Sequence, residues 1–176
     1  MTAGKKMKMG SVAKMEEKKN IMTREGLRKY ENELHDLKVI RRIEVAQKIK
    51  EAREQGDLSE NAEYDAAKDE QRDIEARIVE LEKILKNVEV VDDEDITADR
   101  VMVGSTVTIL DMEFSEEETY KIVGSTEADS LRGKISNESP VGKALIGKSV
   151  GDVITVQTPA GEFGYKVLEI KPPGRE

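Results

Sequence analysis

Two stretches of the chain carry apolar residues at steps of three and four, with charged residues between them. The first set is Leu27, Tyr30, Leu34 and Leu37, and the second set is Ile74, Ile78, Leu81, Leu85 and Val88. This spacing places side chains on one face of an α-helix, and a sustained run of it is typical of a coiled-coil seam. The pattern therefore predicts two long amphipathic helices.

The two sets share one register. Residues that face each other in an antiparallel hairpin lie equally far from the turn, so their numbers have a common sum. The pairs Leu27 with Val88, Tyr30 with Leu85, Leu34 with Leu81, and Leu37 with Ile78 all sum to 115. The same sum pairs Arg41 with Ile74 and Ile49 with Ala66. The turn then falls at residues 56–58, where Gly56 can end the first helix. We expect residues 22–91 to form an antiparallel coiled-coil hairpin, with about 30 residues per arm and a length of roughly 45 Å.

The two ends of this hairpin differ in character. Thr23 is a suitable N-cap for a helix that begins at Arg24, although Gly26 stands where a capping box has glutamate. Toward the turn, alanines replace the large apolar residues, at Ala46, Ala52, Ala62, Ala66 and Ala67. The periodicity alone also fits a structural spacer or an oligomerisation coiled coil. The tapering, charged tip favours a probe that enters a confined aqueous space.

The pattern changes after the acidic residues 92–100, which we interpret as a linker. From residue 101 to 176, short runs rich in β-branched residues are separated by glycines, which predicts a small sheet. Residues 158–161 separate two such runs as a hairpin loop does, and Ser139 precedes one short helix as its N-cap. Most of the aromatic residues of this region are expected to fill its core: Phe114, Tyr120, Phe163 and Tyr165. The fold class is therefore α+β.

Composition narrows the possible functions. The chain has 176 residues, 38% of them charged, with a net charge of -8 and a pI of about 5.0. This acidity argues against nucleic-acid binding over the whole surface, because phosphates require clustered Lys and Arg. The absence of cysteine and the single histidine, His35, exclude disulfides, thiol catalysis and Cys/His zinc sites, and they fit a cytoplasmic location. No apolar run suits a membrane span or a signal peptide, and we interpret residues 1–21 as a flexible or expression-derived leader.

Carboxylates remain as candidates for chemistry, and two of them stand at the predicted turn. Asp57 and Glu60 are three residues apart at the start of the second helix, so their oxygens can lie close together. The same pair is also an acidic form of the capping box, which explains it without any function. Mg²⁺ is usually held by one or two carboxylates together with phosphates and waters. The pair can therefore complete a magnesium site supplied by another molecule, whereas the free protein is expected to bind no cofactor stably.

Residues 51–71, EAREQGDLSENAEYDAAKDEQ, resemble the hairpin tip of the bacterial Gre transcript cleavage factors. The similarity extends to MTREGLRKYENEL, GSTVTIL, YKIVGSTEAD, ISNESPVGKALIGKSVGD and FGYKVLEI, and so covers nearly everything after Met22. The resemblance implies a monomeric accessory factor, not itself an enzyme, that binds RNA polymerase. Such a factor inserts its tip into the secondary channel and stimulates the polymerase to cleave the backtracked 3′ segment of the nascent RNA.

The resemblance also assigns roles to residues near the tip. Asp57 would be the main ligand of the second Mg²⁺ of the polymerase active site, and Glu60 would support that metal or orient the attacking water. Arg53 and Lys68 correspond to a small basic patch that contacts the displaced RNA. An ordinary solvated helix face is the alternative interpretation of these two cations.

In this family the sheet region is an FKBP-like module that docks on an exposed coiled coil at the channel rim. The loop of Glu138, Ser139 and Pro140 corresponds to the docking contact, and a plain loop with a helix cap is the alternative. Prolyl isomerase activity is not expected, because few aromatic residues and no tryptophan are available to line a pocket. A channel-binding inhibitor and a coiled-coil adaptor are further rivals. The intact GDLSEN segment favours the cleavage factor over both.

Overall fold

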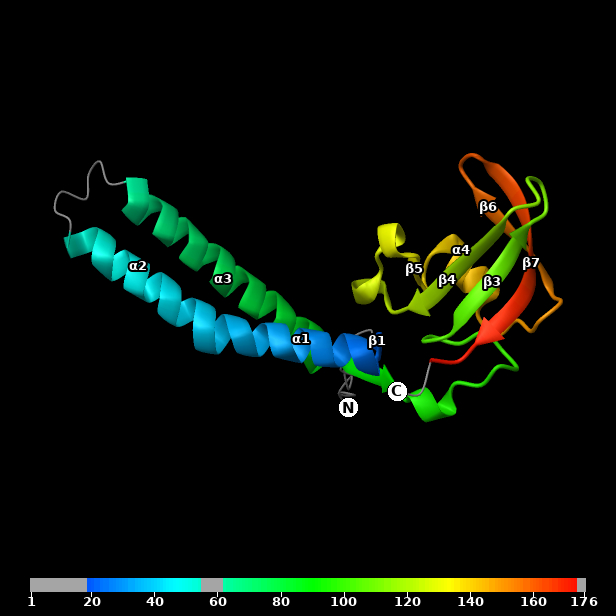
Figure 1. The fold of residues 1–176 in the computed structure, drawn as a ribbon, viewed down its shortest axis with the longest axis horizontal. Helices are drawn as coiled ribbons and strands as arrows, with labels where there is room; N and C mark the ends of the chain where they lie inside the picture. Colours follow the sequence, from blue (N-terminus) through cyan, green and yellow to red (C-terminus); the bar gives the residue numbers. More distant parts are fainter. Residues whose placement is uncertain (1–18, 55–61, 174–176) are drawn as a thin grey trace, which may run out of the picture.

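The computed structural model describes residues 19–54 and 62–173. A long helical hairpin extends away from a separate β-sheet, and the base of the hairpin lies beside the sheet (Figure 1). The predicted combination of a helical hairpin and a sheet, class α+β, is confirmed. No helix in the described ranges is long and apolar enough to cross a membrane.

Three consecutive helical segments form the first arm of the hairpin, and one helix forms the second. They are α1 (Arg24–Asp36), the π-helical turn η1 (Leu37–Arg41), α2 (Arg42–Glu54) and, in the second arm, α3 (Ala62–Lys86). Thr23 caps α1 as predicted, because its hydroxyl oxygen accepts a hydrogen bond from the N–H of Gly26 at 3.0 Å. The first arm therefore begins at a local N-cap, and a π-helical turn separates its two α-helices.

The half of the hairpin nearest the sheet follows the predicted pairing of apolar residues. Its buried cluster is Met22, Tyr30 and Leu81, surrounded by Leu27, Leu34, Leu37, Ile84, Leu85 and Val88. The predicted helix up to Val88 is too long, because α3 ends at Lys86 and Val88 begins the strand β2 (Val88–Val91). The Val-rich run favours a strand, and it pairs in parallel with β1 (Asn20–Thr23). This small sheet at the base was not predicted.

The turn η1 changes the register of the outer half. A π-helical turn holds one residue more than an α-helical turn, so the seam positions beyond it move along the sequence. Arg41 was predicted to face Ile74, but its side chain is 47% exposed and pairs with carboxylates on the surface. Val45, which is only 1% exposed, packs with Ile74 instead. The predicted pairing of Arg41 with Ile74 is therefore wrong.

Some of the predicted alanines are buried in the outer seam, although not all of them. Ala67 is buried in the cluster that contains Ile49, so the predicted pairing of Ile49 with Ala66 is off by one residue. Ala52 is buried as well. The other alanines are exposed: Ala46, Ala62 and Ala66. The buried residues of the outer seam thus include two alanines, Ala52 and Ala67, whose small side chains fill little space between the arms.

The larger sheet has five strands in the order β5–β4–β3–β7–β6. Their bounds are β3 (Thr106–Asp111), β4 (Glu117–Val123), β5 (Lys134–Ser136), β6 (Val153–Thr158) and β7 (Gly161–Lys171). Neighbours are antiparallel except β4 and β5, which are parallel. The loop predicted at residues 158–161 is confirmed, because Thr158 pairs with Gly161. The predicted short helix is α4 (Pro140–Leu145), with Ser139 as its N-cap.

Short 3₁₀ turns connect these elements. They are η3 (Asp93–Asp95), η4 (Ser125–Glu127) and η5 (Ser130–Arg132). The turn η4 lies against β1 and against β5. It therefore joins the edge of the sheet to the base of the hairpin.

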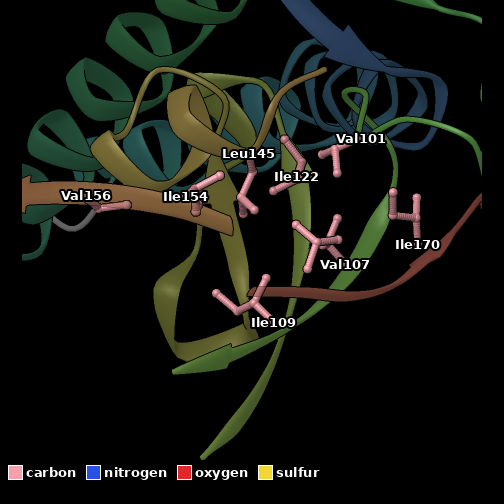
Figure 2. Close-up of a cluster of buried hydrophobic side chains, with 9 residues drawn as sticks. Val101, Val107, Ile109, Ile122, Leu145, Ile154, Val156 and Ile170 are labelled. Carbon is pink, nitrogen blue, oxygen red and sulfur yellow. The ribbon is translucent and has the colours of Figure 1, made fainter. Parts of the chain in front are cut away.

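The core of the five-stranded sheet is aliphatic. Figure 2 shows its buried side chains converging from the strands, from α4 and, for Val101, from the segment before β3: Val101, Val107, Ile109, Ile122, Leu145, Ile154, Val156 and Ile170. Tyr120 and Tyr165 only pack against the edge of this cluster, and Phe114 is 63% exposed. The prediction that most aromatic residues fill the core is therefore wrong. Branched side chains suit the pleated face of a sheet, and here they occupy its interior.

Candidate functional site

The predicted working pair lies outside the described residues. Asp57 and Glu60 belong to residues 55–61, named here the tip segment, which joins α2 to α3. The C-terminus of α2 and the N-terminus of α3 are the parts of the hairpin farthest from the sheet (Figure 1). The site can therefore be built from its flanking residues, from Glu54 backward and from Ala62 forward.

Arg53 and Tyr64 meet across the two arms at this end of the hairpin. The Cζ atom of Arg53 lies 5.7 Å from the centre of the Tyr64 ring, which is the geometry of a cation–π contact. Tyr64 also packs against the cluster that contains Ile49 and Ala67. Tyr64 is thus a packing residue that holds a cation on the surface beside the tip segment.

Lys68, the second member of the predicted basic patch, is exposed on α3. Its Nζ donates a hydrogen bond to Oε1 of Gln71 at 2.7 Å. Lys68 follows Tyr64 by four residues, and residues at that spacing are neighbours on a helix surface. Arg53 and Lys68 therefore both lie around Tyr64, toward the far end of the hairpin.

Ion pairs join the two arms along their length. The pairs are Lys38 with Glu82, Arg42 with Glu75, Lys48 with Glu70, and Arg77 with Glu33. Hydrogen bonding to Lys48 holds the pKa of Glu70 below its ordinary value, and Arg42 does the same for the pKa of Glu75. Such exposed pairs add little stability individually. They favour the observed alignment of the arms and do not form a reactive site.

The predicted docking loop lies at the N-terminus of α4. The hydroxyl oxygen of Ser139 accepts the N–H of Gly142 at 3.0 Å, so Ser139 has a structural role as a cap. The carboxylate of Glu138 accepts a hydrogen bond from the hydroxyl of Ser125 at 2.9 Å. Glu138 and Pro140 are exposed. Those two side chains are therefore more accessible at this loop than Ser139.

The predicted metal ligands, Asp57 and Glu60, lie in the tip segment. Within residues 19–54 and 62–173, no group of three His, Asp or Glu side chains is arranged to hold a metal ion. Asp57 and Glu60 supply hard oxygen donors, which fit Mg²⁺ by their chemistry. Two carboxylates are too few for a complete site, so further ligands have to come from another molecule.

Sequence reasoning missed one residue of functional interest, Glu127. Its carboxylate reaches the base of the hairpin and accepts the N–H of Thr23 at 2.8 Å. The signal in the sequence was Gly26, which occupies the glutamate position of a capping box. That signal indicated an incomplete cap and gave no indication of which residue completes it.

Two family models match the chain. One, described as "Transcription elongation factor, N-terminal", matches residues 20–90, and the other, "Transcription elongation factor, GreA/GreB, C-term", matches residues 96–172. The chain is 69% identical over 157 residues to the transcription elongation factor GreA of Lachnoclostridium phytofermentans, covering 89% of this chain and 98% of that protein. It is 58% identical to the GreA of Thermoanaerobacter pseudethanolicus over 151 residues, covering 86% of this chain and 96% of that protein.

Solved structures are similar over nearly the whole chain at lower identity. GreA factor homolog 1 of Thermus thermophilus is 31% identical with a TM-score of 0.41, covering 88% of this chain and 99% of that one. The elongation factor GreA/GreB of Nitrosomonas europaea is 24% identical with a TM-score of 0.39, covering 88% and 99%.

Proposed function

The chain belongs to the GreA/GreB family of transcription elongation factors, and from this premise we propose that it acts on bacterial RNA polymerase in the cytoplasm. As a monomeric accessory factor, it inserts the tip of its hairpin into the secondary channel. There it stimulates the polymerase's own cleavage of backtracked nascent RNA, so that arrested complexes resume elongation. The catalytic centre belongs to the polymerase, and this chain supplies residues to it.

One observation carries this proposal: the segment GDLSEN, residues 56–61, connects the two arms at the end of the hairpin opposite the sheet. The helix α3 has 25 residues and therefore spans about 37 Å. The buried seam near this end contains small residues, Ala52 and Ala67. A long and narrow hairpin with carboxylates at its end is suited to deliver them into a confined channel.

The tip carboxylates act in the polymerase active site. Asp57 is the main ligand of the second Mg²⁺ there, and Glu60 supports that ligand set or orients the water that attacks the phosphodiester. Mg²⁺ lowers the pKa of bound water and stabilises the attacking and leaving oxygens. Arg53, held over Tyr64, and Lys68 contact the phosphates of the displaced RNA.

The sheet carries the docking surface. Glu138 and Pro140 are exposed at the N-terminus of α4, which supports the proposal that they contact the coiled coil at the channel rim. Ser139 holds this loop in shape through its hydrogen bond to Gly142. The two functions are thus separated in space, with binding on the sheet and chemistry at the hairpin tip.

A stalled elongation complex tests the chemistry. With Mg²⁺, addition of the protein is expected to cause release of short 3′ RNA fragments. The double variant Asp57→Asn, Glu60→Gln is expected to reduce this release at least about 100-fold and to keep its binding to the polymerase. The matched control is Glu51→Gln with Glu54→Gln, which removes two exposed carboxylates of α2 and is expected to cleave normally.

Other outcomes of these assays contradict the proposal or indicate one of the rival functions. Cleavage by the tip variant equal to that of the parent contradicts the proposed role of the carboxylates. Slowed elongation without fragment release indicates a channel inhibitor, and no effect on elongation indicates an adaptor. Tight Mg²⁺ binding by the free protein contradicts the incomplete site, because two carboxylates are too few ligands.

Pro140→Ala tests the docking surface. If Pro140 is one of the few central interface residues whose truncation costs more than about 1 kcal/mol, affinity for the polymerase falls about fivefold or more, and this is the result we expect. Ser139→Ala is also expected to weaken binding, although loss of the helix cap contributes to its effect. Pro159→Ala, in the exposed loop between β6 and β7, is the control. Unchanged affinity of Pro140→Ala in a filter-binding or interferometry assay moves the docking surface elsewhere.

A further inference from the structure

The helix α1 begins with half of a capping box. In a complete box, the N-cap hydroxyl accepts the N–H of the residue at N3, and a glutamate at N3 accepts the N–H of the N-cap. Thr23 makes the first of these bonds, with the N–H of Gly26 at 3.0 Å. Gly26 occupies N3 and has no side chain, so α1 cannot make the second bond by itself.

The second bond comes from a residue that is distant along the chain but adjacent in the fold. Glu127 lies 104 positions along the chain in η4, and its Oε2 accepts the N–H of Thr23 at 2.8 Å. Its other oxygen accepts the hydroxyl of Thr23. Thr23 is only 4% exposed, and hydrogen bonds to a carboxylate are strong where water is excluded. The box is therefore complete, with its glutamate supplied by the sheet.

Glycines allow a close approach at two positions where the hairpin and the sheet touch. A Cβ on Gly26 would lie 2.1 Å from Oε1 of Glu127, so any side chain there displaces that carboxylate. A Cβ on Gly124 would lie 1.8 Å from the carbonyl oxygen of Ile21 in β1. The missing side chain at Gly26 thus leaves the space that the carboxylate of Glu127 occupies.

Other contacts surround this junction. The hydroxyl of Tyr30 donates to the carbonyl oxygen of Thr126. Glu25 pairs with Lys121 at 2.6 Å and with Lys134 at 3.2 Å. These contacts restrict sliding of the two parts. The partly buried hydrogen bonds of Glu127 act at the first turn of α1, where a change of direction of the hairpin begins.

We propose that Glu127 is a positioning residue: by completing the capping box of α1 from the sheet, it fixes the direction of the hairpin. The effect on cleavage rests on the proposed function. The helix α3 spans about 37 Å, so a rotation of about 10° at the base moves the far end by about 6 Å. A misplacement of about 1 Å can cost about 100-fold in rate. Loss of Glu127 therefore impairs delivery of the tip more than it impairs docking.

The direction of the hairpin can be measured on the full chain. The sequence has no cysteine, so Glu51→Cys on α2 and Val150→Cys beside the sheet provide two exposed sites for spin labels. Pulsed dipolar spectroscopy then reports the distribution of distances between them. We expect one narrow distribution for the labelled parent and a broadened one for Glu127→Ala.

A second variant separates helix capping from positioning. Gly26→Glu in the Glu127→Ala background rebuilds the capping box within α1 but does not rebuild the tie to the sheet. We expect this double variant to regain the melting temperature lost by Glu127→Ala, and to keep both the broad distribution and a loss of cleavage of at least about tenfold at saturating protein. Affinity for the polymerase is expected to stay within about twofold of the parent, because the change lies outside the contact itself.

A control variant and the possible outcomes distinguish helix capping from positioning of the hairpin. Glu162→Ala removes an exposed carboxylate of β7 and is expected to match the parent in every assay, and Glu127→Gln replaces the alanine variant if that variant does not fold. A narrow distribution in Glu127→Ala overturns the proposal, as does full recovery of cleavage in the double variant. If the parent itself stimulates no cleavage, the proposed function fails, and the distance measurement still decides whether Glu127 fixes the hairpin.

Discussion

Tyr64 is a single residue that links the packing of the hairpin to its charge. Its ring packs on the outer seam, and the guanidinium of Arg53 lies over it. A cation–π contact at an exposed site contributes about 0.5–1 kcal/mol. That energy is small for the stability of the fold, but it is enough to hold a long and flexible side chain in one direction beside the tip segment.

Tyr64→Leu is therefore expected to reduce RNA cleavage by about two- to fivefold, the equivalent of losing this contact. Arg53→Gln should have a similar effect, and the double variant should be no worse than either, because both changes remove the same placed cation. Tyr64→Phe keeps the ring and should cleave normally. Single-turnover cleavage at saturating protein is the measurement, and normal cleavage by Tyr64→Leu contradicts the role of the ring.

Tyr120 predicts how stability depends on alkaline pH. Burial and, secondarily, its hydrogen bond to Glu118 raise the pKa of Tyr120 to about 12. An unfolded tyrosine ionises near pH 10, so the unfolded chain loses this proton first as pH rises. The contribution of Tyr120 is complete below about pH 10 and is lost between about pH 10 and 12. Urea unfolding across that range should show a shallower decline for Tyr120→Phe, and an equal slope would contradict this.

The residues that could be predicted from the sequence are those whose partners are local. The caps Thr23 and Ser139 were predicted because each cap and the N–H it accepts lie within four residues. Glu127 was not predicted, since its partner is 104 residues away. The carboxylates at positions 57 and 60 were selected from the sequence and remain a prediction, because they lie outside the described residues.

At the scale of elements, η1 decides how the arms fit together. The hydrophobic period indicated both arms and paired them correctly between the sheet and Leu37, where the helices are regular. Beyond that point, a helix with one added residue has its buried positions shifted by one residue relative to a regular helix. Ile49 is compatible with both arrangements. Periodicity cannot distinguish them, whereas the buried Val45 and the exposed Arg41 do.

Substitutions in the first arm test this register. Ile49 is 8% exposed and Ile43 is 66% exposed. Ile49→Ala is expected to lower the free energy of unfolding by about 2–4 kcal/mol, as for other buried isoleucines, and Ile43→Ala to change it by less than about 0.5 kcal/mol. Arg41→Leu is expected to be neutral. A large stabilisation by Arg41→Leu in urea unfolding would mean that position 41 lies in the seam and that η1 is not formed.

In the whole molecule, different residues set the length and the direction of the hairpin. Its direction is set at the base, where Glu127 and Gly26 join the sheet to α1. Its length is set by the arms, whose buried positions repeat at intervals of seven between Val45 and Ala52 and between Ala67 and Ile74. Length can therefore be changed in whole repeats without disturbing the junction.

Removal of residues 45–51 together with residues 67–73 keeps the seam in phase and shortens each arm by about 10 Å. We expect the shortened chain to fold and to bind the polymerase through the unchanged sheet. It should stimulate no cleavage, because its tip carboxylates stop short of the active site by far more than the roughly 1 Å that a reacting group tolerates. The control refills both gaps with seven-residue segments that keep Val45, Ile49 and Ala67 and exchange the exposed residues conservatively. Restored cleavage in the refilled chain assigns the loss to length, whereas normal cleavage by the shortened chain contradicts delivery of the tip through a channel.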